Sequence, residues 1–143
     1  MAYYPIFLDI AGKPVVVVGA GKVALRKTRG LLEAGAAVTV VAPRAEPEFA
    51  RLGITMRPRA FRASDIRGAV LAFAATDDRG VNHAVAQAAR RHGIPVNVAD
   101  AREECSFIVP ARIARGNLQI AISTGGESPR LAAALRRKIE ENL

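Results

Sequence analysis

The sequence predicts a protein of the α/β class, in which a parallel sheet is followed by a small C-terminal α+β segment. The apolar runs at residues 15–18 and 69–75 lack polar alternation, which is typical of strands buried on both faces of a parallel sheet. Helical patterns separate the strand-like runs as far as Asp100. Beyond residue 105, strand-like pieces follow one another with short links, so the architecture changes near the end of the chain.

The first buried strand runs directly into a glycine-rich turn, Gly19-x-Gly21-x-x-Ala24, and then into a helical pattern at residues 22–34. Strand, glycine turn and helix in this order indicate a Rossmann-type unit that binds a dinucleotide. Gly19 permits the tight turn, Gly21 lets a pyrophosphate approach the backbone, and Ala24 lets the helix pack closely on the strand. The N–H groups of the first helical turn would then face the phosphates. An ordinary strand-to-helix turn that needs glycines is the alternative.

The next elements continue the alternation of strands and helices. The helix at residues 22–34 ends at Gly35, and its predicted buried face consists of Val23, Leu31 and Leu32. Residues 36–41 form the second strand, which makes residues 14–41 one parallel, right-handed βαβ unit. The further elements that we expect are an edge strand or ordered arm at 3–10, a short helix at 46–52, an edge strand at 54–59, a buried strand at 69–75, a helix at 81–92 and a strand at 95–99.

The C-terminal part is predicted to be antiparallel. Strand-like pieces lie at residues 106–109, 111–115 and 118–123, and the turn Arg115-Gly116-Asn117 would join the last two as a hairpin. Ser128-Pro129 then begins a helix, with serine as the N-cap and proline at the first helical position. One apolar stripe follows this helix and consists of Leu131, Leu135, Ile139 and Leu143.

A strand pair with one helix is too small to bury this stripe, so we expect it to pack on a second copy of the chain. The predicted organisation is therefore a dinucleotide-binding Rossmann domain at residues 1–112, which the family resemblance described below makes NAD-binding, and a dimerisation segment at residues 113–143.

Composition narrows the class of protein. The single cysteine, Cys105, excludes an intramolecular disulfide and fits a reducing compartment. No apolar run approaches the roughly 20 residues that a membrane span requires, and the N-terminus lacks a signal-peptide pattern, so we expect a cytoplasmic protein without a membrane partner. The net charge of +8 fits an anionic partner or simply favours solubility. Low aromatic content and the absence of long Lys/Arg blocks argue against nucleic acid.

Polar groups are expected to gather at the carboxyl edge of the parallel sheet, where doubly wound sheets bind ligands. The glycine turn, Thr76-Asp77-Asp78 and Asn97-x-x-Asp100 all follow or end predicted strands. A carboxylate at Asp100 would serve as a general base, although a loop-capping aspartate explains the position equally well. Asp77 or Asp78 is expected to cap the next helix rather than to bind a metal.

Three other polar features bear on ligands. The second strand ends in Ala42-Pro43-Arg44 and lacks the acidic residue that usually holds an adenosine ribose; Arg44 would suit the 2′-phosphate of NADP or lie beside the adenine. The glycine-rich turn from Ser123 to Ser128 is a second candidate anion site. His83 and His92 are nine residues apart, which is not a metal-ligand spacing, and we assign no metal ligand.

Several motifs together, in this order and at this spacing, resemble the precorrin-2 dehydrogenase/sirohydrochlorin ferrochelatase family, which includes the N-terminal part of siroheme synthases. The motifs cover almost the whole chain. They are Pro5-Ile6-Phe7, Val18-Gly19-Ala20-Gly21-Lys22-Val23-Ala24 with Arg26-Lys27, Leu32-Glu33-Ala34-Gly35-Ala36, Ala74-Ala75-Thr76-Asp77-Asp78 with Val81-Asn82, Asn97-Val98-Ala99-Asp100, Ser106-Phe107-Ile108-Val109-Pro110, and Ser123-Thr124-Gly125-Gly126-Glu127-Ser128-Pro129.

The resemblance implies oxidation of precorrin-2 to sirohydrochlorin with NAD, and for many members Fe²⁺ insertion to give siroheme. It assigns the acid–base role to Asp100, and it favours NAD over NADP because the family also lacks the ribose acid. The cofactor-binding residues that we expect are Gly19, Gly21, Lys22, Val23, Pro43, Arg44 and Thr76. The substrate-binding residues that we expect are Asn97, Ser123 and Ser128. The resemblance also implies a homodimer. It implies a substrate with eight carboxylates as well, which a protein with a positive net charge would attract.

Two other functions compete with this interpretation. A non-catalytic NAD-binding regulatory Rossmann module usually keeps an acid after the second strand, and Ala42-Pro43 argues against it. A tetrapyrrole-binding protein that has lost catalysis would not need Asp100. Family members usually continue into a further helical segment, so residues 113–143 are expected to be truncated relative to the family. This difference bears on chelation and substrate affinity more than on NAD binding.

Overall fold

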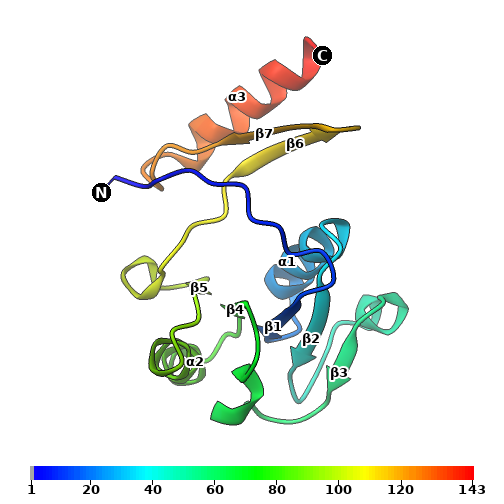
Figure 1. Cartoon of the computed structure of the whole chain (residues 1–143), viewed down its shortest axis with the longest axis vertical. Coiled ribbons are helices and arrows are strands. Elements are labelled where there is room, and N and C mark those ends of the chain that lie inside the picture. Colours follow the sequence, from blue (N-terminus) through cyan, green and yellow to red (C-terminus); the bar gives the residue numbers. More distant parts are fainter. Residues whose placement is uncertain (1) are drawn as a thin grey trace. The chain divides into compact units, whose positions relative to one another are not determined.

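The computed structural model describes residues 2–143, which form two compact units (Figure 1). Residues 8–107 make up the larger unit, and residues 2–7 with 108–143 make up the smaller one. The domain boundary between residues 112 and 113 stays a prediction. None of the helices in the described residues is long and apolar enough to cross a membrane.

Residues 8–107 contain a five-stranded sheet in which every neighbouring pair is parallel, as the sequence predicts. The strands are β1 (Pro14–Val18), β2 (Ala37–Val41), β3 (Thr55–Arg57), β4 (Leu71–Ala74) and β5 (Val96–Val98), in the order β3-β2-β1-β4-β5. The chain runs outward from β1 through β2 to β3 on one side and from β4 to β5 on the other. The strand order therefore reverses between β1 and β4, which is the switch point where such sheets bind ligands. Val18 lies opposite both Val41 and Ala74, so these three strands end at one edge.

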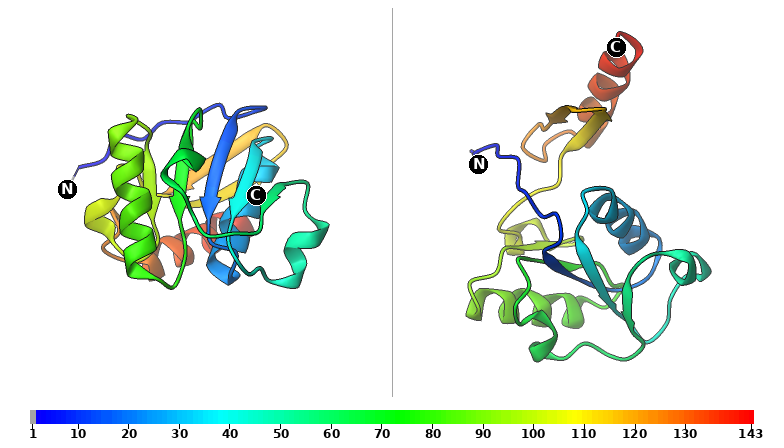
Figure 2. Two further views of the ribbon diagram at one scale, coloured as in Figure 1. Left: turned by 90° about the horizontal axis from the view of Figure 1, so that it is seen from below. Right: turned by 45° about the vertical axis from the view of Figure 1, so that its right-hand side comes forward.

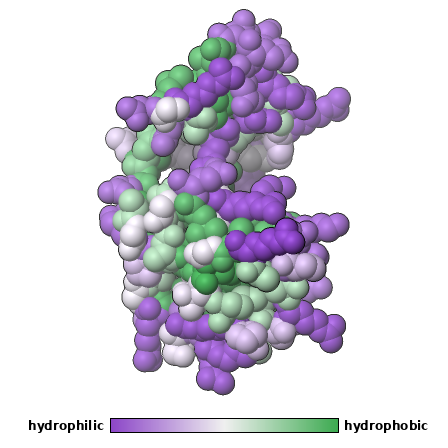
Figure 3. Space-filling view, turned by 90° about the vertical axis from the view of Figure 1, so that its right-hand side faces the viewer, coloured by the Kyte–Doolittle hydropathy of each residue, from purple (hydrophilic) through white to green (hydrophobic). Residues whose placement is uncertain are grey.

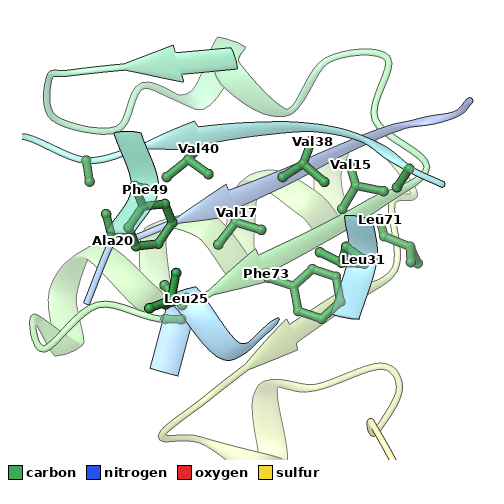
Figure 4. Close-up of a cluster of buried hydrophobic side chains, with 14 of the residues drawn as sticks. Val15, Val17, Ala20, Leu25, Leu31, Val38, Val40, Phe49, Leu71 and Phe73 are labelled. Atoms are coloured by element: carbon green, nitrogen blue, oxygen red, sulfur yellow. The ribbon is translucent and has the colours of Figure 1, made fainter. Parts of the chain in front are cut away.

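Helices cover both faces of this sheet. The main helices are α1 (Lys22–Glu33) and α2 (Arg79–Arg91), with short 3₁₀ helices η1 (Pro47–Arg51), η2 (Ala63–Ile66) and η3 (Arg102–Glu104) (Figure 2). Val15 and Val17 pack with Leu25 and Leu31 of α1 on one face (Figure 4). The alternate valines of β1 pack on α2 on the other face. This two-sided burial explains the absence of polar alternation in β1.

Two local predictions for this unit are wrong. Val23 is 43% exposed, because the buried face of α1 is formed by Ala24, Thr28 and Leu31 instead. Residues 106–109 are irregular rather than a strand. Ser106 bonds to Val96 through its own N–H and accepts the Val96 N–H on its hydroxyl, so a side chain replaces part of a sheet ladder there.

The expected edge strand at 54–59 shortens to β3, and the expected short helix at 46–52 is the 3₁₀ helix η1. Residues 3–10 contain no strand and form an irregular segment in the structure of residues 2–143. The helix predicted at 81–92 begins two residues earlier, at Arg79, and Asp78 caps it as expected by accepting the Val81 N–H at 3.1 Å.

A buried ion cluster fastens β3 to η2. The side chain of Asp65 is 1% exposed and accepts hydrogen bonds from Arg57 at 2.9 Å, from both terminal nitrogens of Arg59 at 2.6 and 2.9 Å, and from the N–H of Arg62 at 2.8 Å. The Arg59 hydrogen bond is the main cause that lowers the pKa of Asp65 to about 2. The cluster therefore fastens the edge strand more strongly when this carboxylate is charged.

The smaller unit contains the predicted hairpin and helix. Strands β6 (Ala111–Arg115) and β7 (Leu118–Ile122) are antiparallel, and α3 (Pro129–Glu141) packs on them. Ser128 caps α3 as predicted, accepting the Leu131 N–H at 3.1 Å. The side chains of Ile113 and Ala132 are buried in this unit. Leu131, Leu135 and Leu143 stay exposed at 51%, 39% and 50%.

Figure 3 shows one face of the molecule, where hydrophilic side chains cover much of the surface and apolar patches interrupt them. Exposed large apolar residues occur in both units and are most exposed near the N-terminus, at Tyr4, Ile6 and Phe7. The apolar stripe of α3 is therefore part of a wider set of uncovered apolar side chains.

Candidate functional site

The turn after β1 accepts only glycine at its first position. Gly19 has a φ of +112°, and a Cβ on it would collide with the backbone carbonyl of Ala75. Its N–H donates to the Val41 carbonyl at 2.9 Å, and the Ala75 N–H donates to Val18 at 2.8 Å. These hydrogen bonds tie the turn at Gly19 to the ends of the two strands that flank β1, which are β2 and β4.

The N-terminus of α1 is open. Gly21 is its N-cap, and no side chain of residues 2–143 caps this end. A Cβ on Gly21 would meet no described atom within 4 Å, so space lies directly beyond the backbone here. The first turn carries no acidic side chain, and Lys22 and Val23 are exposed. Uncapped N–H groups, free space and a lysine fit the pyrophosphate of a dinucleotide.

Pro43 and Arg44 follow β2 at the same edge and are both exposed. The loop is tied to the glycine turn, because the Glu46 N–H donates to the Ala20 carbonyl at 2.9 Å. Among residues 2–143, no side chain or carbonyl bonds to the guanidinium of Arg44, which is thus available to a ligand. These positions stay predicted cofactor contacts.

A buried asparagine joins the ends of β4 and β5. Asn82 in α2 is fully buried, and its Oδ1 accepts from the N–H of Thr76 at 3.1 Å and from the Thr76 hydroxyl at 2.7 Å. Its Nδ2 donates to the Thr76 carbonyl and to Oδ1 of Asp100, both at 3.0 Å. The predicted cofactor residue Thr76 and the predicted base Asp100 are therefore brought together through a third side chain.

Charged side chains extend this network outward. Arg79 donates to Oδ1 of Asp100 at 2.8 Å and also pairs with Glu104. Glu104 contacts Nδ1 of His83 at 2.6 Å through its other oxygen. The side chain of Asp100 remains 42% exposed, although its Oδ1 accepts from Arg79 and Asn82. An oriented, accessible carboxylate of this kind can take a proton from a ligand.

Sequence reasoning missed Arg79, Asn82 and Glu104 as parts of this site. Arg79 and Asn82 are three residues apart in the first turn of α2, so they share one helix face, directly after the Thr76-Asp77-Asp78 segment. That spacing and, for Asn82, its place in the Val81-Asn82 motif are the indications that the sequence offers. Glu104 lies in a short 3₁₀ helix after β5, and no sequence pattern links it to Arg79.

Asn97 lies within β5 and is buried. Its Oδ1 accepts from Nζ of Lys27 at 3.1 Å, and its Nδ2 donates to the Phe107 carbonyl at 3.1 Å. Burial is the main cause that lowers the pKa of Lys27, and the ammonium also lies over the Phe73 ring. Both ends of the Asn97 amide are thus occupied, and its contact with substrate stays a prediction.

Ser123 and Ser128 belong to the smaller unit. The Ser123 hydroxyl accepts the Gly125 N–H at 3.0 Å, and the Ser128 hydroxyl caps α3. Each hydroxyl keeps its own proton as a donor, so a role toward substrate carboxylates stays a prediction. Residues 2–143 contain no group of three or more His, Cys, Asp or Glu side chains that could hold a metal ion.

Comparisons with known proteins identify the family. Residues 6–111 match the family model described as "Putative NAD(P)-binding", and residues 115–142 match "Sirohaem biosynthesis protein central". The chain is 54% identical to the siroheme synthase of Methylococcus capsulatus and 45% identical to that of Azotobacter vinelandii. Each alignment covers 98% of the chain but only 30% or 31% of the relative, so the chain spans about a third of the length of these proteins.

Solved structures agree with these matches. The structure of SirC, precorrin-2 dehydrogenase, matches with a TM-score of 0.82 and 32% identity over 99% of this chain and 71% of that one. A Granulicella formate dehydrogenase matches with a TM-score of 0.54 and 19% identity over 68% of this chain and 27% of that one, which shows a shared fold alone. The family expected from the motifs is thus confirmed: the chain belongs to the NAD(P)-binding family of siroheme-biosynthesis proteins that includes SirC, precorrin-2 dehydrogenase.

Proposed function

We propose that the chain catalyses the NAD-dependent dehydrogenation of precorrin-2 to sirohydrochlorin. The observation that carries this proposal is the Asp100 carboxylate, which is accessible and is held by Asn82 at the edge where the open end of α1 also lies. SirC, a precorrin-2 dehydrogenase, covers nearly the whole chain in the structural comparison, which supports this substrate. The net charge of +8 suits a polycarboxylate substrate.

The chain's own residues have separable tasks in this reaction. The backbone at Gly19 and Gly21 and the first turn of α1 receive the pyrophosphate, with Lys22 and Val23 beside it. Pro43, Arg44 and Thr76 line the rest of the cofactor site. NAD, when bound, supplies a two-electron acceptor for hydride. The substrate loses a second hydrogen as a proton, which Asp100 accepts and passes to water. The sum is precorrin-2 plus NAD⁺ giving sirohydrochlorin, NADH and a proton.

The same carboxylate supports a second proposal, the insertion of Fe²⁺ into sirohydrochlorin. Iron enters as a substrate and displaces two pyrrole protons, so the reaction needs an accessible proton acceptor near the macrocycle. Asp100 is such an acceptor, with its side chain 42% exposed. This lyase activity is measured by adding Fe²⁺ or Co²⁺ after dehydrogenation and following the absorption spectrum of the metallated product.

We further propose that the protein acts in the cytoplasm as a homodimer. Exposed leucines along one stripe of α3 support self-association, because their burial against a second copy would remove apolar surface from water. The single, half-buried cysteine supports a reducing compartment.

Turnover with each cofactor tests the main proposal. Precorrin-2 is mixed with the protein and NAD⁺ or NADP⁺, and the reduced cofactor is followed by absorbance. We expect NADH and sirohydrochlorin in equal amounts, and a higher kcat/KM for NAD⁺ than for NADP⁺. Tight NAD⁺ binding without any turnover would favour the non-catalytic regulatory module instead. The variant Glu103→Gln, which changes an exposed carboxylate of η3, serves as a matched control for the substitutions at Asp100.

A further inference from the structure

Asn82 uses its whole hydrogen-bonding capacity at the proposed site. A primary amide offers two N–H donors and two acceptor lone pairs. In Asn82 the acceptors take the N–H and the hydroxyl of Thr76, and the donors reach the Thr76 carbonyl and Asp100. The side chain is fully buried, so water cannot replace these partners. Its orientation is therefore fixed, and so is the direction from which it approaches Asp100.

The two oxygens of Asp100 are not equivalent. Oδ1 accepts from Nδ2 of Asn82 at 3.0 Å and from Nη1 of Arg79 at 2.8 Å. Both of these donors to the Asp100 side chain reach Oδ1, and none of residues 2–143 donates to Oδ2; the side chain as a whole is 42% exposed. Hydrogen bonds stabilise negative charge on the oxygen that receives them. The oxygen without donors is thus the one that gains more by taking a proton.

We propose that Asn82 and Arg79 are positioning residues that reserve Oδ1 of Asp100 for the protein, so that Oδ2 receives the proton of the substrate. The inference rests on the proposed dehydrogenation. In this step a bond from hydrogen to the macrocycle breaks, its electron pair stays in the ring system, and an O–H bond forms at Oδ2. The hydride leaves with the other electron pair to NAD⁺, and the proton then passes from Oδ2 to water.

Charged side chains of α2 and η3 surround Asp100 and its partners, and they include Arg90, which donates to the Glu104 carbonyl. Arg79 of α2 faces the carboxylate directly, Glu104 of η3 faces Arg79, and His83 of α2 lies on the far side of Glu104. Glu104 therefore helps to fix the position of the Arg79 guanidinium, which donates to Asp100. A change at Asn82 alters the buried side of this arrangement, and a change at Arg79 alters its exposed side.

Substitutions on both sides test the proposal by the pH profile of kcat/KM for precorrin-2. Asn82→Ala should lower kcat on the order of 10²-fold with little change in KM, because orientation is lost while binding is kept. Asn82→Asp places a second carboxylate against Oδ1, so the pair holds a shared proton. The acid limb of its profile should move to higher pH. Gln87→Glu, an amide-to-acid change on the exposed face of α2, should leave kcat and the pH of the acid limb unchanged.

Arg79 provides a variant that does not disturb the buried core. Arg79→Met should also move the acid limb to higher pH, and Arg79→Lys should restore it, because lysine keeps a charged donor. A role limited to folding would lower the rate at every pH without moving the limb. If the limb stays at the wild-type pH in both Asn82→Asp and Arg79→Met, the proposal is overturned.

A second measurement separates this inference from the dehydrogenase proposal. In the ¹⁵N-labelled full chain, the Nδ2 protons of Asn82 should exchange slowly with solvent, and Asp100→Ala should accelerate one of them at least tenfold. An unchanged exchange rate overturns the positioning role even if precorrin-2 is oxidised. A wild type that does not oxidise precorrin-2 overturns the dehydrogenase proposal, and with it the role of Oδ2, whatever the exchange rate is.

Discussion

Nδ2 of Asn82 lies 3.0 Å from Oδ1 of Asp100 and joins the loops that follow β4 and β5 through one buried amide. The two residues are 18 positions apart, and the contact forms only because α2 returns along the sheet. A fixed carboxylate at the carboxyl edge is what distinguishes this unit from a dinucleotide-binding turn alone.

Gly21→Ala should weaken NAD binding without unfolding the protein. The new methyl group would occupy the open space beyond the backbone, where the pyrophosphate is proposed to lie, and we expect an affinity loss of about tenfold or more, or about 1.4 kcal/mol. Stability should change by less than about 1 kcal/mol, because a poorer N-cap offsets the lower entropy of the unfolded chain. Titration with NADH and urea denaturation measure the two effects.

Gly19→Ala is the contrasting control for that variant. Its φ of +112° and the collision with the Ala75 backbone should cost about 1–3 kcal/mol of stability. If Gly21→Ala bound NADH as tightly as the wild type, the pyrophosphate would not lie at this turn.

Asp65→Asn should destabilise the larger unit and alter its acid sensitivity. The folded state lowers the pKa of Asp65 from 3.8 to about 2, so the carboxylate contributes about 2 kcal/mol above pH 4. This contribution is lost as the pH falls through the interval from about 4 to about 2. Urea denaturation at several pH values should show a smaller acid loss for Asp65→Asn than for the wild type. Equal acid losses in both proteins would contradict the charged role of the cluster.

Leu135→Glu should convert a dimer into a monomer. Leu135 is 39% exposed on the stripe of α3, and a charge there could not be buried against a second copy without a large desolvation cost. Sedimentation velocity measures the mass of the particle, and Arg137→Glu on an exposed face of the same helix is the matched control. A wild type that sediments as a monomer at every concentration would rule out the dimer.

Local patterns were enough to predict much of the fold. The valines of β1, the glycine turn, the caps at Asp78 and Ser128 and the hairpin β6–β7 all depend on residues close in sequence. The position of Asp100 after β5 was predictable for the same reason, because the strand pattern ends there.

Features that depend on tertiary contacts were not predictable. Residues 106–109 have strand-like residue types, but the hydroxyl of Ser106 takes the place of a backbone partner on β5. Val23 is apolar, yet it lies where α1 has just begun and faces away from the sheet. The Asn82–Asp100–Arg79 network requires α2 and the loop after β5 to meet, and no spacing along the chain specifies that meeting.

The comparison of wild type with Asp100→Asn tests the central claim most directly. Asparagine keeps the shape and an acceptor oxygen but cannot take a proton, so NAD binding should be unchanged. With saturating precorrin-2 and NAD⁺, the wild type should form sirohydrochlorin and NADH in equal amounts, and the variant should be slower by 10²–10⁴-fold, the range typical of a lost general base. A variant that forms sirohydrochlorin at the wild-type rate, or a wild type that forms none, would contradict the account.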